Sequence, residues 1–291
     1  MNVRQHILNE IKKRNLFEGF DDEGNPDTKY YAFDWDDNIC FMPTQIIVIT
    51  ENEDEVGMST DDFAEHRHQI GVEPFNYKGT TVVGYAPNPF RNFTTEGDKK
   101  FVIDSMIASP GPSWNDFVEC INGGSIFSII TARGHNPETL KEGVYNFIIS
   151  NHNGLNSKTL VENLKKYRNL ADNPISEAFD LKVNDKEIIQ EYLDMCRFYP
   201  VTFGDGSAAN PEEGKIKAMR EFISYCKELA TEIGKKAFFK NDVENNETLP
   251  IIGFSDDDPR NIEKMKEFLS SEYKDKPVRT YLTKGGEKLE V

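Results

Sequence analysis

The sequence has few basic residues and no long apolar run, and both shortages exclude classes of protein. Its 291 residues carry 34 basic and 50 acidic side chains, a formal net charge of −16. A surface with this balance repels phosphate backbones and anionic membranes, so extended nucleic acid is not an expected partner. No run of about eighteen apolar residues is present, so we expect no membrane-spanning helix and no membrane partner.

Cysteine is also scarce, which excludes a disulfide-stapled scaffold and a cysteine-ligated zinc site. The four cysteines are scattered and form no CxxC pair: Cys40, Cys120, Cys196 and Cys226. In a chain of this length they are typical of reduced thiols. The amphipathic start of the chain, Met1 to Phe20, lacks an apolar stretch of signal-peptide length. We therefore expect a cytoplasmic protein.

What the sequence does contain is a series of short apolar runs, each ending abruptly in polar residues. They cover residues 30–33, 126–130, 198–203, 251–254 and 278–282. Nearly continuous apolar runs bounded by turn residues are typical of strands covered on both faces. Between them, apolar residues recur at helical spacing, as after Asn136 and after Asn261. Strands that alternate with helices predict an α/β fold with a doubly wound parallel sheet.

Two stretches interrupt this alternation. Residues 41–112 begin with an extended segment and an acidic turn, then continue through a loop rich in proline, asparagine and glycine from residue 74 onward. We interpret them as an inserted cap that starts with a hairpin. Residues 151–196 are polar and helical, an elaboration of the core. The predicted domains are therefore a core made of residues 1–40 and 113–291, and a cap of residues 41–112.

The polar residues that follow the first predicted strand could carry out phosphate chemistry. Ligands of open α/β sheets bind beyond the carboxyl ends of the strands, where Asp34 and Asp36 are expected. One carboxylate can attack phosphorus while the second protonates the leaving group and later activates water. The alternative is that this acidic pair is an ordinary surface turn.

A second acidic cluster, Asp256, Asp257 and Asp258, follows another predicted strand. Buried carboxylates are costly unless a cation binds them, and together with Asp34 they would make an oxygen site suited to Mg²⁺. The alternative is a helix N-terminus, where acidic residues are favourable in themselves. Asp258, followed by a proline, fits that alternative best.

Two further positions complete the candidate site. Thr131 and the N–H of Ala132 end a predicted strand, where a hydroxyl and free amides can bind an anion. Lys215 lies just inside a predicted helix and could neutralise charge between a nucleophile and a phosphate. It is preferred to Lys217, which we place closer to solvent. Each of these residues could equally be a turn residue or a solvated lysine.

In their order along the chain, these residues resemble the four motifs of the haloacid dehalogenase (HAD) superfamily. The resemblance implies that Asp34 is the nucleophile and a metal ligand, and that Asp36 is the general acid/base with its backbone carbonyl on the metal. It further implies that Thr131 and Ala132 hold the phosphoryl group and that Lys215 steadies it. The remaining Mg²⁺ site would come from Asp256 and Asp257. Asn38 departs from the family pattern, in which threonine or valine is usual.

These implications lead to an expected function, a Mg²⁺-dependent phosphatase acting on a small phosphorylated substrate. Asp36 at its position favours phosphoryl transfer over dehalogenation. The ending from Asp256 to Asn261 resembles the branch with polynucleotide 3′-phosphatases, so a nucleotide or nucleic-acid-end phosphatase is one alternative. A non-catalytic binding module with the same fold is the other. The cap sequence carries no motif that identifies the substrate or the oligomeric state.

Overall fold

In a computed structural model of the chain, the described residues are 19–20, 26–27, 29–170, 184–202, 211–237, 251–273, 278–284 and 287–291. Residues 203–210 and most of the N-terminal segment lie outside them. Within the described residues, no helix combines the length and apolar character needed to cross a membrane. All four cysteines are buried and form no disulfide.

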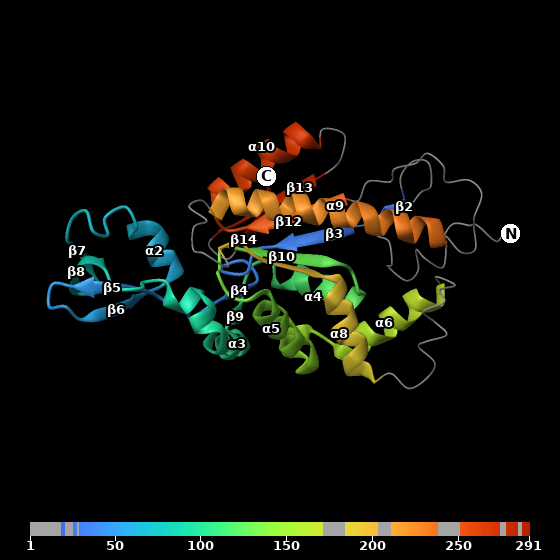
Figure 1. Cartoon of the computed structure of the whole chain (residues 1–291), viewed down its shortest axis with the longest axis horizontal. Helices are drawn as coiled ribbons and strands as arrows, with labels where there is room; N and C mark the ends of the chain where they lie inside the picture. The colour runs from blue at the N-terminus through green and yellow to red at the C-terminus, as the bar shows by residue number, and fades with distance from the viewer. Residues whose placement is uncertain are drawn as a thin grey trace.

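A six-stranded sheet forms the centre of the molecule (Figure 1). Its order is β11 (Arg197–Pro200), β10 (Phe127–Thr131), β3 (Lys29–Phe33), β12 (Ile251–Asp256), β13 (Val278–Lys284) and β14 (Glu287–Glu290). The first five strands pair in parallel, and only β14 is antiparallel to its neighbour. The chain is thus a mixed α/β protein, and five of the six strands correspond to the predicted apolar runs. The hairpin strand β14 was not predicted.

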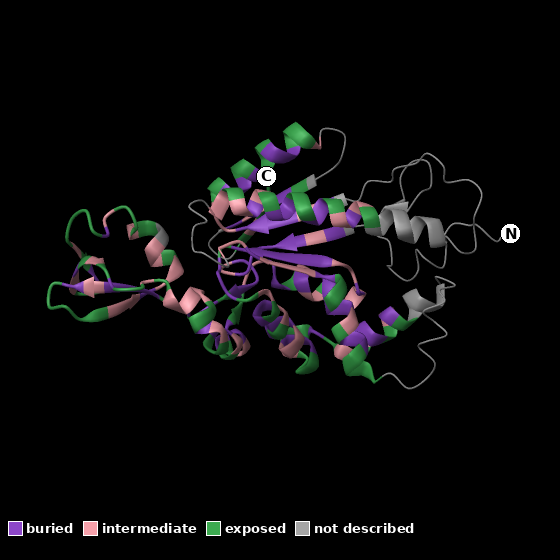
Figure 2. Ribbon diagram, in the orientation of Figure 1, coloured by how far each residue is buried: buried purple, intermediate pink, exposed green. Residues whose placement is uncertain are grey.

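Helices cover both faces of this sheet because alternate side chains of each strand point to opposite faces. Tyr30 and Ala32 of β3 pack with α9 (Pro211–Ala237) and α10 (Pro259–Glu272). Phe33 points the other way, into a larger cluster shared by α3 (Asp98–Ile107) and four further helices. These are α4 (Trp114–Gly123), α5 (Pro137–Ile149), α6 (Ser157–Leu170) and α8 (Asp185–Met195). Figure 2 shows the sheet as the most continuously buried part of the molecule.

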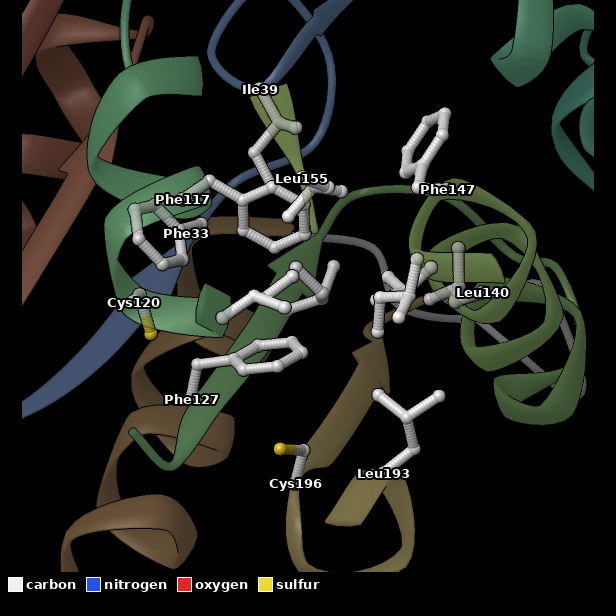
Figure 3. Packing of buried hydrophobic residues seen from close by; sticks show 14 of the residues in the cluster. Phe33, Ile39, Phe117, Cys120, Phe127, Leu140, Phe147, Leu155, Leu193 and Cys196 are labelled. Carbon is white, nitrogen blue, oxygen red and sulfur yellow. The ribbon is translucent and has the colours of Figure 1, made fainter. Parts of the chain in front are cut away.

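Aromatic rings fill the larger cluster (Figure 3). Phe33 meets Phe117 edge-on at a centroid distance of 5.5 Å, and Phe117 meets Phe127 in the same way at 5.6 Å. Edge-to-face pairs of this kind add about 0.5–1.5 kcal/mol each beyond the burial of their area. They fix α4 over β3 and β10, the two strands that lead into the predicted site.

The helix boundaries follow local capping. The side chain of Asn136 accepts a hydrogen bond from the N–H of Glu138, and Pro137 occupies the first turn of α5, as the sequence predicted. The N-cap of α10 is Asp258, with Pro259 next. The apolar residues that recur after Asn261 therefore lie inside a helix that begins at Pro259.

Residues 46–85 form a separate four-stranded antiparallel sheet, the β5–β8 lobe. It contains β5 (Ile46–Thr50), β6 (Glu55–Met58), α2 (Thr60–His66), β7 (Phe75–Tyr77) and β8 (Thr80–Tyr85), in the order β6-β5-β8-β7. Its own small core is built on Val48, Met58, Ile70, Tyr77 and Val82. In Figure 1, α2 lies on the side of the lobe that faces the six-stranded sheet, and β3 points toward the lobe.

The prediction of one long loop after residue 74 was wrong. This stretch contains the β7–β8 hairpin, the 3₁₀ turns η1 (Arg91–Phe93) and η2 (Thr95–Gly97), and helix α3 (Asp98–Ile107). It ends in β9 (Ser109–Pro110), which pairs with β4 (Cys40–Phe41) and returns the chain to the core. The hairpin turn places Gly79 at φ 87°, so the glycine marked a tight turn between two strands. The predicted helical stretch 151–196 contains α6, α8 and the 3₁₀ turn η3 (His152–Gly154).

Candidate active site

Parallel pairing of β3 and β12 brings the two acidic motifs together. The N–H of Asp34 donates to the carbonyl of Ser255 at 3.0 Å, so Asp34 lies beside the end of β12. Asn38 strengthens this junction, since its side-chain amide donates to the carbonyl of Asp34 at 3.0 Å and to Ser255 Oγ at 2.9 Å. Its Oδ1 accepts from Thr283 Oγ1 at 3.2 Å. Asn38, the departure from the family pattern, therefore ties the loop after β3 to both β12 and β13.

Three carboxylates converge at this junction. One oxygen from each of Asp34, Asp256 and Asp257 lies within 4.8 Å of the others. The side chains of Asp34 and Asp256 are buried. Oδ1 of Asp34 is buried and has no hydrogen-bond partner among the described residues. A buried carboxylate oxygen without a donor is costly, so the arrangement fits a hard cation bound by these oxygens.

Burial and mutual repulsion shift the titration of these acids upward. Burial raises the pKa of Asp34 to about 7, an effect that Lys215 opposes and Asp256 reinforces. Burial also raises the pKa of Asp257 to about 9, with further contributions from Asp256 and Asp34. Without a bound cation, the cluster therefore favours the protonated, neutral form of these acids near neutral pH.

Lys215 is the one positive side chain that contacts this cluster in the described part of the chain. It is buried, and its Nζ lies 2.7 Å from Asp256 Oδ2 and 3.2 Å from Asp34 Oδ2. Burial lowers its pKa, but Asp256 and Asp34 more than reverse this, and the net direction is upward. Lys215 is therefore charged, while Lys217 is exposed two residues later on α9.

The remaining bonds of Asp256 hold it in place. Its Oδ1 accepts from Asn261 Nδ2 at 2.9 Å and from the N–H of Asp258 at 3.0 Å. Asp258 itself caps α10 through the N–H of Arg260 and lies outside the three-carboxylate cluster. This matches the prediction that Asp258 is a helix cap. The amide of Asn261 fixes the orientation of Asp256 from the first turn of the same helix.

Thr131 and Ala132 lie at the end of β10, the strand beside β3. Thr131 is buried, with its hydroxyl 3.4 Å from the N–H of Arg133. Ala132 is exposed, and its carbonyl accepts from Thr202 Oγ1 at 2.8 Å. Because β3 and β10 are parallel neighbours, both residues lie at the same edge of the sheet as Asp34.

Asp36 does not join the three carboxylates through its side chain. Both of its oxygens instead accept from Arg133, Oδ2 from Nε at 2.8 Å and Oδ1 from Nη2 at 2.7 Å. This two-point pairing holds the Asp36 carboxylate in one orientation. Asp36 thus lies at the site but is turned toward β10.

Sequence reasoning did not identify Arg133, although it lies two residues after Thr131. Its side chain is only 1 % exposed. Besides Asp36, it donates to Thr44 Oγ1 at 2.9 Å and lies 3.0 Å from His135 Nε2. An arginine in a turn is usually solvated, so only the presence of a nearby acid, Asp36, could have indicated a buried pair.

His135 continues this network away from the sheet. Its Nδ1 lies 2.9 Å from Asp98 Oδ1, at the start of α3. Burial and the neighbouring Arg133 lower the pKa of His135, and Asp98 opposes the shift. His135 is fully buried and links the core to α3.

The candidate site therefore consists of three neighbouring carboxylates, Asp34, Asp256 and Asp257, with Lys215 paired to the first two. Thr131 and Ala132 lie at the end of the next strand, and Arg133 holds Asp36. The separation of these residues along the chain, from 34 to 257, is bridged by one parallel sheet. No protein-family model, curated protein or solved structure matches the chain, so any statement about its function depends on these residues and their geometry.

Proposed function

We propose that the chain is a HAD-like, Mg²⁺-dependent phosphatase that hydrolyses phosphate monoesters through an aspartyl-phosphate on Asp34. The observation that carries the proposal is the meeting of Asp34 with Asp256, Asp257 and Lys215 at one edge of the sheet. A buried acid with an unpaired oxygen beside a buried lysine is a candidate nucleophile in a site prepared for anionic charge.

In the first half of the reaction, a carboxylate oxygen of Asp34 attacks the phosphorus atom of the ester. A bond forms between that oxygen and phosphorus while the bond from phosphorus to the ester oxygen breaks. Asp36 gives its proton to the departing oxygen, which leaves as an alcohol. Lys215, 3.2 Å from Asp34 Oδ2, offsets the negative charge gathered around phosphorus.

In the second half, Asp36 accepts a proton from a water molecule, whose oxygen attacks phosphorus. The bond between phosphorus and Asp34 breaks, phosphate leaves, and the carboxylate of Asp34 is restored. Both proton transfers require Asp36 to turn away from Arg133, because both of its oxygens accept hydrogen bonds there. Thr131 and the N–H of Ala132 hold the phosphate oxygens in this proposal.

The metal ion fits the donor set. Asp34, Asp256 and Asp257 would hold Mg²⁺ together with the carbonyl of Asp36, and the ion would neutralise charge on the phosphoryl group. The cluster contains three carboxyl groups and one lysine, so a bound divalent cation would balance its remaining negative charge.

The first test is hydrolysis of p-nitrophenyl phosphate by the full-length protein. We expect release of p-nitrophenol with Mg²⁺ and a loss of at least about 100-fold when EDTA removes it, since a metal supplies several kcal/mol of transition-state stabilisation. Re-addition of Mg²⁺ should restore the rate. Hydrolysis that is absent with Mg²⁺, or unaffected by EDTA, would refute the proposed function.

The acid cluster also predicts how Mg²⁺ binding depends on pH. The ordinary pKa of both acids is 3.8, and folding raises it to about 7 for Asp34 and about 9 for Asp257. A carboxyl with a raised pKa favours the folded state at low pH, and this contribution is lost as the pH rises from about 4 to about 9. Mg²⁺ competes with these protons, so it should raise Tm little at about pH 5 and more at about pH 8.5.

Thermal unfolding with Mg²⁺ and with EDTA at both pH values measures this difference without any substrate. Asp257→Asn removes one of the two titrating acids and should reduce both the Mg²⁺ effect and its pH dependence. Asp116→Asn, on α4 and outside the cluster, is the control. An Mg²⁺ effect on Tm that is equal at both pH values would contradict the proposed binding site.

A further inference from the structure

Four aromatic side chains of the β5–β8 lobe and the segment that follows it form one contiguous cluster. This aromatic wall consists of Phe63 on α2, Tyr85 at the end of β8, and Phe90 and Phe93 in the segment that follows. Phe63 lies 5.5 Å from Phe90 and 6.4 Å from Tyr85, measured between ring centroids. Phe90 lies 6.2 Å from Tyr85 and 6.4 Å from Phe93.

Both ends of the aromatic wall are tied to the loop that carries Asp36. At one end, Thr60 Oγ1 donates to Asp37 Oδ2 at 2.7 Å, and Phe63 lies one helical turn after Thr60 on the same face of α2. At the other end, the guanidinium of Arg133 lies 4.8 Å from the centroid of the Phe93 ring. The same guanidinium binds Asp36.

These contacts close a ring. It runs from Asp37 through α2 and the aromatic wall to Arg133, and from there back to Asp36. Because the contacts begin at Asp37 and end at Asp36, the aromatic wall must lie close to the candidate site. Figure 1 shows the same arrangement: β3 points toward the lobe, and α2 lies on the side of the lobe that faces the six-stranded sheet.

Two members of the wall, Tyr85 and Phe90, do not belong to the hydrophobic core of the lobe. Its core contains Val48, Met58, Ile70, Tyr77 and Val82, with Phe63 packed against it, but neither Tyr85 nor Phe90. Tyr85 is 40 % exposed and Phe90 is 39 % exposed. Adjacent exposed aromatic rings beside a polar site are typical of a surface that binds an apolar part of a ligand.

We propose that the aromatic wall binds a planar aromatic group in the leaving alcohol of the substrate, with Tyr85 and Phe90 as its specificity-determining contacts. The inference rests on the proposed phosphatase function and names the substrate class of that site. A substrate whose phosphoryl group lies at Asp34 would place its alcohol on the open side of the sheet edge, where the lobe lies. Aromatic rings bind other planar rings by stacking without requiring one hydrogen-bond pattern.

Paired substrates test this class because they differ in the ring and keep the type of ester. Adenosine 5′-monophosphate and ribose 5-phosphate form one pair, and benzyl phosphate and butyl phosphate form the other. We expect kcat/KM to be at least about 10-fold higher for the aromatic member of one pair or both, the scale of a single stacking contact. A preference within the first pair identifies a nucleobase, and one within the second an aryl group.

Variants assign the preference to the wall. Tyr85→Ala and Phe90→Ala should each reduce it by about 10-fold, mainly through a higher KM for the aromatic ester, and should leave kcat/KM for its partner ester unchanged. Tyr85→Phe keeps the ring and should keep the preference. Val72→Ala, an exposed apolar residue of the lobe outside the wall, is the matched control. Thermal unfolding of each variant checks that the lobe stays folded.

Two outcomes would overturn the inference in different ways. Equal kcat/KM within both pairs, or a preference that survives both alanine variants, would refute the aromatic wall as a specificity surface and leave the phosphatase proposal intact. Hydrolysis of p-nitrophenyl phosphate but of none of the four esters would refute the inference alone, and loss of p-nitrophenyl phosphate hydrolysis as well would refute both.

Discussion

Asp34→Asn should abolish phosphate-ester hydrolysis, with a loss of at least about 10³-fold in kcat. The substitution keeps the size of the side chain but replaces the attacking carboxylate with an amide, which is a poor nucleophile toward phosphorus. It also removes one negative charge from a cluster in which burial raises the pKa of the acids. The folded state should therefore lose little stability. The expected result is an inactive protein with a normal unfolding transition.

The covalent adduct gives a direct measurement of the attacking residue. The unsubstituted protein, denatured by acid during turnover, should carry the mass of one phosphoryl group on the peptide that contains Asp34. The Asp34→Asn protein should show none. Asp36→Asn is the matched comparison, because p-nitrophenol leaves without help from an acid. That variant should form the adduct and release phosphate from it slowly. An adduct on another residue, or turnover by Asp34→Asn, would eliminate Asp34 as nucleophile.

The five parallel strands of the central sheet were predictable because each is a short apolar run, and the runs at its centre, β10, β3 and β12, are largely buried. A run such as Ile251–Phe254 is too short for a buried helix, so its length favours a strand. Each run is followed at once by polar residues. Parallel strands place such endings at one edge of the sheet, so the approach of Asp34 to Asp256 followed from the order of the elements. The preference for Lys215 over Lys217 came from the helical wheel, and the buried contact of Lys215 agrees with it.

Other features depend on contacts between segments that are far apart in the sequence. The hairpin β7–β8 was hidden because its strands mix polar and apolar residues and only Tyr77 and Val82 in them are buried, so neither strand shows a continuous apolar run. The pairing of Asp36 with Arg133 joins residues separated by 97 positions and has no local signal. The aromatic wall likewise takes its members from a helix, a strand and a loop. Sequence periodicity shows which residues share a face of a single helix or strand. Each of these features joins residues from different elements, so periodicity could not show them.

Replacement of Lys215 by methionine should have the largest effect on stability. Methionine has a similar length but carries no charge, so Asp34 and Asp256 would lose the buried cation that lies 3.2 Å and 2.7 Å from their oxygens. Loss of one partner from a buried ion pair typically costs about 3–5 kcal/mol, because the remaining charges stay buried and unpaired. We expect the free energy of unfolding in EDTA to fall by about this amount. Turnover should fall as well, since the charge opposite the phosphoryl group is lost.

Lys217→Met is the matched control, since it makes the same substitution at an exposed position of the same helix. Its effect on the unfolding free energy should stay within about 0.5 kcal/mol. If Lys215→Met does not fold in EDTA, the double variant Lys215→Met/Asp34→Asn should recover part of the loss, because it removes one of the unpaired carboxylates. Mg²⁺ should stabilise Lys215→Met more than the unsubstituted protein, since the cation becomes the sole positive charge near the three acids. A Lys215→Met protein as stable and as active as Lys217→Met would show that Asp34 and Asp256 do not need this lysine, and the charge balance proposed for the site would be wrong.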